Sequence, residues 1–470
     1  MDDITPLSIN RLAELIRKRA LSPVEIVEAY LRRIEELNPS LNAIVTLAPD
    51  VLEQARAAEA SLMRAKAPGP LHGVPLTIKD TIETAGLRTT SGSAIRAGHI
   101  PQADAPAVAR LKAAGALILG KTNTAEMAMD YTADNPIFGR SCNPHDSSRT
   151  PGGSSGGEAA AIAAGMSPGG IGTDLAGSIR IPAHFCGIAG LKPGSSRIPG
   201  AGQFPESVGP YSLGATIGPL ARRVEDLDLL FNVLSGSEMP QSLLWSEASL
   251  QRRRVMRGWR VGWYTDDGVI PVTAETRQAV IAAVGALSAA GLVTEECRPP
   301  GVERGPDLWL KLFSRASVVA LREAYNGREV EAGAFVRWRL ATADNTPPGT
   351  LDQYIRDWWE RDRLRAALVQ WLETTPLIVC PVGATAAFEH DAHKVTVAGK
   401  TINTFRAFSY SQTFNVFDLP AASIPAGRSA EGLPIGVQIV GRPDEEAMVL
   451  AAAAIVAEAL GDWQSLSDKL

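Results

Sequence analysis

The chain has 470 residues, of which 45% are hydrophobic and 21% charged, a composition typical of a folded globular protein. Its mild formal net charge of −5, with no basic stripe, argues against a nucleic-acid-binding protein. We also expect neither a membrane span nor a secretory signal, because no run of about 18 apolar residues exists and the N-terminal segment MDDITPLSINRL is acidic and polar.

The first third of the chain predicts helices that alternate with strands. Two helices are expected in the first fifty residues, and the second begins at the Ser-Pro-Val-Glu capping box at 22–25 and ends at Asn38, before Pro39. The alternating apolar segment 73–78 predicts a strand that leads into Lys79. Farther on, we expect a helix over 108–114, a buried strand over 116–119 and a helix over 158–164.

The rest of the chain continues this alternation. The expected elements are a strand over 260–264, a helix over 274–290, a long helix over 352–373 and an apolar strand over 377–380. This pattern predicts an α/β fold with a central sheet covered by helices on both faces. Because no repeat, linker or low-complexity segment interrupts it, we expect one domain over residues 1–470, with a helical subregion within 300–375.

Two serines and a lysine carry the strongest chemical signal. Ser154 lies in GGSSGG, Ser178 follows 24 positions later in TDLAGSIR, and Lys79 lies in the upstream segment GVPLTIKD. The glycines around both serines let backbone N–H groups approach a small reacting centre closely. An isolated glycine-serine loop is usually structural. Two such serines, with a lysine as the only nearby candidate base, instead indicate a hydrolase that does not use histidine.

Residues 115–122, GALILGKT, match the phosphate-loop pattern G-x-x-x-x-G-K-T. A phosphate loop needs an irregular segment whose amides surround the phosphates, whereas the Ala-Leu-Ile-Leu spacer at 116–119 reads as a strand. We therefore expect no nucleotide site here and interpret Lys121 as a structural residue.

Residues 152–156 also satisfy G-x-S-x-G, the nucleophile elbow of α/β-hydrolases, in which Ser154 would attack. That elbow follows a buried strand, yet the preceding segment NPHDSSRTP is polar and broken by prolines. The histidines that could complete such a triad downstream are His184, His390 and His393. This esterase-like interpretation is a less favoured alternative.

The serine motifs resemble the signature of the amidase signature family, serine hydrolases with a Ser–cis-Ser–Lys triad. The shared features are GGSSGG, the 24-residue gap, TD-x-x-GSIR-x-PA at 173–183, CGIAGLKP at 186–193 and GVPLTIKD at 73–80. Weaker matches at 120–129 and 433–441 extend the resemblance over most of the chain, and residues 240–400 are the least diagnostic. The resemblance implies the amidase signature fold, a single domain with a large twisted mixed sheet.

The resemblance implies catalytic roles for Lys79, Ser154 and Ser178. A serine hydroxyl is a poor nucleophile until a base takes its proton, and an ordinary lysine is held neutral at pH 7 only at a cost of about 4–5 kcal/mol. Burial of Lys79 at the end of an apolar strand would supply this depression of its pKa. Ser154, expected after a cis peptide bond, would pass a proton between Lys79 and Ser178. Ser178 would then attack the carbonyl carbon and form an acyl-enzyme.

Backbone N–H groups beside Ser178 are the expected oxyanion hole, in which each donor contributes about 3–4 kcal/mol in comparable hydrolases. The expected donors are the amides of Leu175, Ala176, Gly177 and Ser178. Ala176 stands where the family usually has a glycine, and an alanine restricts the loop to negative φ more strongly. Asp418 likewise stands where many members have glycine.

Three further residues belong to the predicted site. Asp174 and Arg180 bracket Ser178, and we interpret them as a buried ion pair that holds the loop. By resemblance, Met127 lines the acyl side of the pocket, although a methionine is by default a core residue.

The sequence therefore predicts a metal-free and cofactor-free amidase that hydrolyses a carboxamide or carbamate C–N bond of a small molecule. The segment 300–400, with Trp309 and Trp338, is expected to form the leaving-group side of the pocket and to favour an apolar or aryl substrate portion. The four cysteines lack a C-x-x-C pair, so they predict neither a disulfide framework nor a zinc site. We expect a soluble cytoplasmic protein without nucleic-acid or membrane partners, and a homodimer is compatible with this interpretation.

Two other functions stay open. One is the glutaminase (amidase) subunit of a tRNA-dependent amidotransferase, which frees ammonia from glutamine for a partner subunit. Such a subunit typically continues past the signature with a tyrosine-containing motif, whereas this chain reads LKPGSSRIPGAGQFP from Leu191. This difference favours a free-standing amidohydrolase. The other is a scaffold with a vestigial site, which the presence of all three triad residues disfavours.

Overall fold

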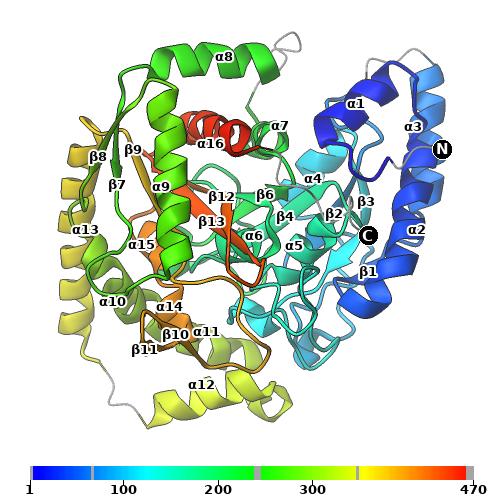
Figure 1. The fold of residues 1–470 in the computed structure, drawn as a ribbon. Coiled ribbons are helices and arrows are strands. Elements are labelled where there is room, and N and C mark those ends of the chain that lie inside the picture. Colours follow the sequence, from blue (N-terminus) through cyan, green and yellow to red (C-terminus); the bar gives the residue numbers. More distant parts are fainter. Residues whose placement is uncertain (1–3, 65–67, 238–244, 346–348, 462–470) are drawn as a thin grey trace.

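One mixed sheet of 11 strands runs through the molecule, in the order β1-β3-β2-β4-β6-β5-β12-β13-β9-β7-β8 (Figure 1). The structure is a computed structural model that describes residues 4–64, 68–237, 245–345 and 349–461. The sheet strands are β1 (Ile44–Leu47), β2 (Pro75–Lys79), β3 (Leu117–Thr122), β4 (Gly169–Asp174), β5 (Ala189–Lys192), β6 (Thr216–Ala221), β7 (Arg260–Trp263), β8 (Val293–Glu296), β9 (Leu377–Pro381), β12 (Ala421–Arg428) and β13 (Pro434–Gly441). A separate hairpin pairs β10 (Lys394–Val397) with β11 (Lys400–Asn403).

Helices flank this sheet. They are α1 (Ile9–Arg17), α2 (Pro23–Leu41), α3 (Val51–Met63), α4 (Pro106–Ala113), α5 (Gly156–Ala163), α6 (Arg180–Cys186), α7 (Val224–Ser235), α8 (Trp245–Met256), α9 (Ala274–Ala289), α10 (Gly305–Trp309), α11 (Arg315–Tyr325), α12 (Ala334–Asp344), α13 (Leu351–Leu372), α14 (Thr404–Ala407), α15 (Tyr410–Val416) and α16 (Glu446–Leu460). The layer of α7, α9 and α16 packs on β5, β6, β9, β12 and β13, while α5 and α6 pack against each other and on the sheet. The predicted α/β class with a central sheet between helices is thus confirmed.

The second helix shows where a local signal succeeds and where it fails. Ser22 and Glu25 form the predicted capping box, with both side chains bonded to backbone N–H groups. The predicted end before Pro39 is wrong, because α2 continues through Pro39 to Leu41. Pro39 lies in the last turn of α2, where its missing N–H removes one backbone hydrogen bond and does not break the helix. The helix ends at Leu41 because the following residue, Asn42, has a left-handed φ of +47°.

The GALILGKT segment contains a strand and no phosphate loop, as predicted. Its residues 117–122 form β3, which pairs with β2 on one side and β1 on the other. Lys121 is fully buried and donates to the Ile82 carbonyl and to the hydroxyls of Thr84 and Thr89. Burial lowers the pKa of Lys121 to about 8. Its contacts are therefore those of a structural residue.

Strand β4 was not predicted, because its sequence GGIGTD is poor in the β-branched and aromatic residues that mark strands. Two of its glycines leave space for neighbouring atoms of β2, of α5 and of the turn before α5. A Cβ on Gly170 would lie 2.1 Å from the Thr77 carbonyl oxygen and 2.2 Å from Glu158 Oε1. A Cβ on Gly172 would lie 2.6 Å from Ser155 Oγ. The missing side chains let α5 and the turn before it lie directly against the sheet.

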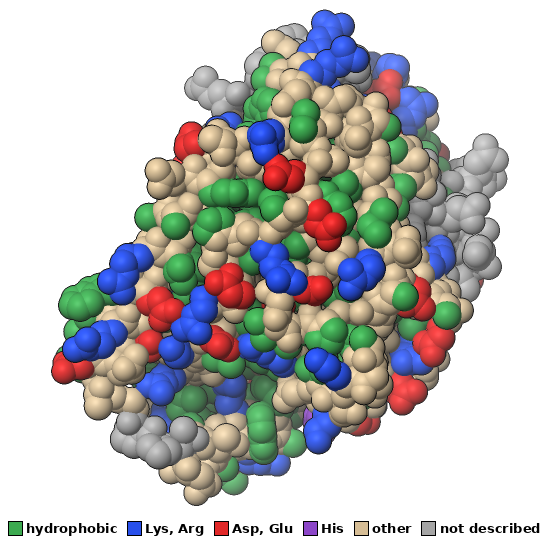
Figure 2. All heavy atoms as spheres, turned by 60° about the vertical axis from the view of Figure 1, so that its left-hand side comes forward, with side chains coloured by type: hydrophobic (Ala, Val, Ile, Leu, Met, Phe, Trp, Pro, Cys, Tyr) green, Lys and Arg blue, Asp and Glu red, His purple; other side chains and the backbone are tan. Residues whose placement is uncertain are grey.

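Helices dominate residues 302–345 and 349–372, where the structure places α10 to α13 and the short helical turns η4, η5 and η6. The shorter helical turns of the chain are η1 (Ala94–Arg96), η2 (Glu126–Ala128), η3 (Gly209–Leu213), η4 (Val302–Arg304), η5 (Leu310–Ser314) and η6 (Glu329–Glu331). On the face that carries α13 and β8, basic, acidic and hydrophobic side chains are interspersed (Figure 2). The exposed hydrophobic residues of α13 include Leu351, Ile355 and Trp359.

Gly170→Ala should lower the free energy of unfolding by at least about 1–3 kcal/mol, because the added methyl group meets a backbone oxygen that cannot move away. Gly285→Ala is the matched control, since Gly285 lies in α9 with nothing within 4 Å of the added Cβ. That change should raise the free energy of unfolding by about 0.5–1 kcal/mol. Urea unfolding followed by circular dichroism measures both. Equal stability of the two variants would contradict this explanation of β4.

Candidate active site

The amine of Lys79 lies at the carboxyl end of β2, and its side chain is fully buried. Its Nζ donates to Ser154 Oγ at 2.6 Å and to Thr173 Oγ1 at 2.7 Å. Burial lowers the pKa of Lys79 to about 7, although the charges of Asp174 and Glu158 act in the opposite direction. A substantial fraction of this amine is therefore neutral near pH 7 and able to accept a proton.

Ser154 lies in a tight turn immediately before α5. The peptide bond between Gly153 and Ser154 is cis, as the family resemblance implies. The backbone N–H of Ser155 donates to the Ser178 carbonyl oxygen at 3.2 Å. This bond holds the Ser154 turn beside the loop that carries Ser178. The structure thus places Ser154 in contact with Lys79, and the backbone of Ser178 beside the turn that carries Ser154.

The loop after β4 is organised by the carboxylate of Asp174. Asp174 Oδ1 accepts the N–H of Gly177 at 2.8 Å, and Oδ2 accepts the N–H of Ile179 at 3.1 Å. Gly177 has a φ of +107°, and a Cβ there would lie 2.6 Å from the Ser411 side chain. Only glycine fits this position, both for its backbone conformation and for the space around it.

The expected ion pair between Asp174 and Arg180 is present and completely buried, with Arg180 Nη2 3.0 Å from Asp174 Oδ1. Arg180 also donates to Gln438 at 2.8 Å and to Asn415 at 2.6 Å. Burial opposes ionisation of Asp174, but the charge and hydrogen bonds of Arg180 outweigh it and hold the pKa of this carboxyl well below its usual range. The pair therefore stays charged and connects the loop to α15 and β13.

The bond from Gly177 to Asp174 narrows the set of predicted oxyanion donors. The N–H of Gly177 is already occupied, which leaves those of Leu175, Ala176 and Ser178. Ala176 is not among the described non-glycine residues with positive φ, so an alanine fits this position without backbone strain. Asp418 does have a positive φ, +48°, which accounts for the glycine that many family members have there.

Met127 is fully buried in a cluster that includes Leu321 and Tyr325 of α11 and Val336 of α12. Its φ of +54° is unusual for a non-glycine residue. The structure thus places Met127 where η2 contacts the helical subregion. Its role in substrate binding stays a prediction.

Two of the three candidate histidines, His184 and His390, are bonded to backbone groups and not to Ser154. His184 accepts the N–H of Gly436 at its Nδ1 and lies 2.9 Å from the Thr385 carbonyl at its Nε2. Burial lowers the pKa of His184 to about 4, so it stays neutral. His390 is bonded to the Ser147 carbonyl. Ser154 instead contacts a lysine, which removes support for the nucleophile-elbow interpretation.

Two polar residues beside the lysine were not predicted from the sequence. Thr173 is the second hydroxyl partner of Lys79. Glu158, fully buried in α5, accepts the hydroxyls of Thr77 at 2.5 Å and Thr122 at 2.7 Å, and burial raises its pKa to about 7. The sequence does offer a sign of Glu158, because a charged residue is unusual within the alanine-rich segment that follows GGSSGG.

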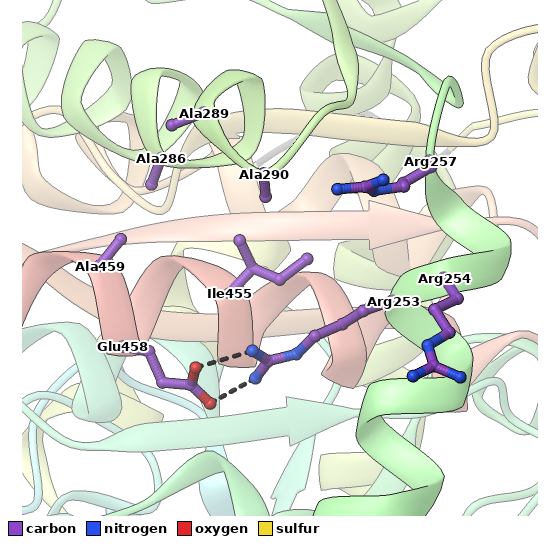
Figure 3. A pocket seen from close by; sticks show the side chains of 9 residues that line it. All are labelled: Arg253, Arg254, Arg257, Ala286, Ala289, Ala290, Ile455, Glu458 and Ala459. Atoms are coloured by element: carbon purple, nitrogen blue, oxygen red, sulfur yellow. Dashed lines mark hydrogen bonds and ion pairs between the residues drawn. The ribbon is translucent and has the colours of Figure 1, made fainter.

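A groove of about 630 Å³ lies elsewhere, between α8, α9 and α16 (Figure 3). Its lining residues are Arg253, Arg254, Arg257, Ala286, Ala289, Ala290, Ile455, Glu458 and Ala459. Arg253 is paired with Glu458 across it. None of its three helices holds a residue of the Lys79 site, so the groove is a separate feature.

Within the described ranges, no three His, Cys, Asp or Glu side chains are grouped to hold a metal ion. Among the helices of the same ranges, none is both long and apolar enough to cross a membrane.

Comparison with known proteins gives a consistent result. The family model Amidase matches residues 25–450. A glutamyl-tRNA(Gln) amidotransferase subunit of Heliobacterium modesticaldum is 32% identical, over 98% of both chains. Human fatty-acid amide hydrolase 2 is 30% identical, over 97% of this chain and 90% of that protein. A bacterial aryl acylamidase of the amidase signature family superposes with a TM-score of 0.86 at 26% identity, over 98% of each chain.

Proposed function

The chain belongs to the amidase signature family, and we propose that it hydrolyses the C–N bond of small-molecule carboxamides or carbamates through an acyl-enzyme on Ser178. One observation carries this proposal: the fully buried amine of Lys79 lies 2.6 Å from the Ser154 hydroxyl. Its partners there are hydroxyl groups, and a lysine with such partners and a pKa of about 7 is suited to act as a general base.

The proton path that we propose begins at this contact. Lys79 takes the proton of Ser154, and Ser154 takes the proton of Ser178 as the Ser178 oxygen bonds to the substrate carbonyl carbon. The tetrahedral intermediate then expels the amine, which receives the proton back through Ser154. Water hydrolyses the resulting ester by the same path, which releases the acid and restores Ser178.

The negative charge on the carbonyl oxygen needs fixed donors. We assign this role to the N–H groups of Ala176 and Ser178, with Leu175 as a third candidate. Asp174 binds the intervening N–H of Gly177. Donors held in this way need little reorganisation during the reaction, which is the main source of stabilisation in oxyanion holes.

An apolar or aryl substrate portion is supported by the rings beside this loop. Tyr131 stacks on Phe405 with ring centroids 4.9 Å apart, and Phe405 contacts Trp309 at 5.2 Å. Phe405 is only partly buried. The relatives named for fatty-acid amides and aryl acylamides agree with such a substrate, and the helical subregion would shape its leaving-group side.

The alternative is a glutaminase subunit of a tRNA-dependent amidotransferase. Relatives of both kinds are about equally similar to this chain, at 32% and 30% identity, so identity does not choose between them. The segment after Lys192 lacks the tyrosine-containing continuation of those subunits. We therefore favour the free-standing hydrolase.

Ser178→Ala should abolish both turnover and covalent labelling by a serine-directed fluorophosphonate, because it removes the attacking oxygen. Ser212→Ala, at an exposed serine outside the site, is the matched control and should be labelled like the wild type. Intact-mass spectrometry measures the labelling. Loss of labelling in Ser154→Ala with full labelling of Ser178→Ala would instead support the nucleophile elbow.

The pH dependence of kcat/KM should report the titration of Lys79. The base is the neutral amine, so the rate should rise with pH through about 7, far below the 10.5 of an ordinary lysine. Glu158→Gln removes a charge that raises the pKa of Lys79, so its acid limb should move to lower pH. Lys79→Ala should be inactive at neutral pH. A flat profile between about pH 6 and 9, with activity retained in Lys79→Ala, would exclude Lys79 as the base.

The purified chain alone should hydrolyse amides or carbamates without tRNA, ATP or a second protein. Product release from a p-nitroanilide, an aliphatic amide, a carbamate and glutamine tests this. Removing the apolar group of a good substrate should lower kcat/KM about tenfold for each 1.4 kcal/mol of lost contact. Activity on glutamine alone, and only with an added partner protein, would establish the amidotransferase alternative.

A further inference from the structure

Two aromatic side chains bind successive carbonyl groups in the loop that carries Ser178. The indole Nε1 of Trp309 donates to the Leu175 carbonyl oxygen at 2.8 Å. The hydroxyl of Tyr131 donates to the Ala176 carbonyl oxygen, also at 2.8 Å. Trp309 ends α10 and Tyr131 follows η2, so segments far apart in the sequence meet at this loop.

Both donors are held in place. Gln412 of α15 donates to the Tyr131 hydroxyl at 2.8 Å, which directs the hydroxyl proton toward Ala176. Phe405 packs between the two rings, nearly parallel to Tyr131 at 14° and tilted by 57° against Trp309. Tyr131 is 2% exposed and Trp309 5% exposed. Neither side chain has room to turn away from its carbonyl.

A trans peptide unit points its C=O and its N–H in opposite directions. Fixing the Ala176 carbonyl on Tyr131 therefore directs the N–H of Gly177 to the other side, where Asp174 accepts it at 2.8 Å. The peptide unit between Ser178 and Ile179 has the same arrangement. The Ser178 carbonyl oxygen accepts the N–H of Ser155 on one side, and the N–H of Ile179 donates to Asp174 on the other.

The peptide unit between Leu175 and Ala176 has the same geometry. Trp309 holds the Leu175 carbonyl, which directs the N–H of Ala176 away from the indole. Asp174 does not take this N–H, because its two oxygens are bonded to Gly177, Ile179 and the Arg180 side chain. The Ala176 N–H is thus fixed in direction and available to a substrate oxygen.

We infer that Trp309 and Tyr131 are positioning residues for the oxyanion hole. Trp309 aims the N–H of Ala176 at the substrate oxygen through the Leu175 carbonyl. Tyr131 holds the Ala176 carbonyl, which keeps the neighbouring N–H of Gly177 on Asp174 and fixes the loop from which the donors project. This inference rests on the proposed acyl-transfer reaction. The sequence predicts Trp309 only as part of the pocket wall. The inference adds a second role, the positioning of a donor N–H at the reacting centre. Because the donors matter most when charge develops on the substrate oxygen, loss of either bond should lower kcat more than it raises KM.

Trp309→Phe and Tyr131→Phe each remove one hydrogen bond and keep the ring. We expect kcat to fall about 10- to 100-fold, with KM changed less than about threefold. A trifluoromethyl ketone, which forms a tetrahedral adduct on Ser178, should bind the variants more weakly by about the same factor as kcat/KM falls. The reduced product amine or alcohol, which forms no adduct, should bind them unchanged. Tyr30→Phe removes the hydrogen bond of a buried tyrosine of α2 to the Thr5 carbonyl, and Trp259→Phe changes a partly buried ring beside Arg442; these two variants are the matched controls and should behave as the wild type.

Two results would overturn the inference while leaving the proposed function intact. One is wild-type kcat in both Phe variants. The other is a loss of activity that appears only in KM, with adduct formation by the ketone unchanged. Failure of the proposed function would look different, since wild-type turnover would then survive Ser178→Ala. Tyr131→Phe tests the inference alone if Trp309→Phe does not fold.

Discussion

The buried ion pair of Asp174 and Arg180 is the constraint on which the reacting loop depends. The carboxylate accepts alternate N–H groups after β4, and the guanidinium reaches Asn415 and Gln438 on two other elements. Removing one partner of such a pair leaves an uncompensated buried charge, at a cost of about 3–5 kcal/mol. The loop therefore has one stable arrangement, with its N–H groups divided between Asp174 and the side that faces a substrate.

This pair also permits the unusual state of Lys79. A lysine beside a carboxylate normally keeps its proton, because the opposite charge favours the charged form. Asp174 does raise the pKa of Lys79, but its oxygens are bonded to Arg180 and to the loop, and the lysine amine donates to the hydroxyls of Ser154 and Thr173. Desolvation consequently dominates, and the amine becomes a base near neutral pH.

Close approach of backbone segments links these two features. Glycines at 170 and 172 allow α5 and its preceding turn to lie directly on β4, which places Ser154 over Lys79. Gly177 allows the loop to turn back against α15. The aromatic rings of residues 131, 309 and 405 close the other side of this loop. The polar groups of the site are thus positioned by the packing of elements that lie far apart in the sequence.

The sequence by itself determined the features that depend on neighbouring residues or on a fixed motif. The capping box at Ser22, the strand that leads into Lys79, the strand within GALILGKT and the serine spacing were all readable, because local periodicity and motif chemistry are properties of short segments. Tertiary structure alone decided the rest. Strand β4 forms without β-favouring residues, the Gly177 N–H is taken by Asp174, and Trp309 binds a carbonyl 134 positions earlier. Each of these depends on which distant atoms fill the space around a backbone group, and that is set only when the whole sheet and its helices have packed.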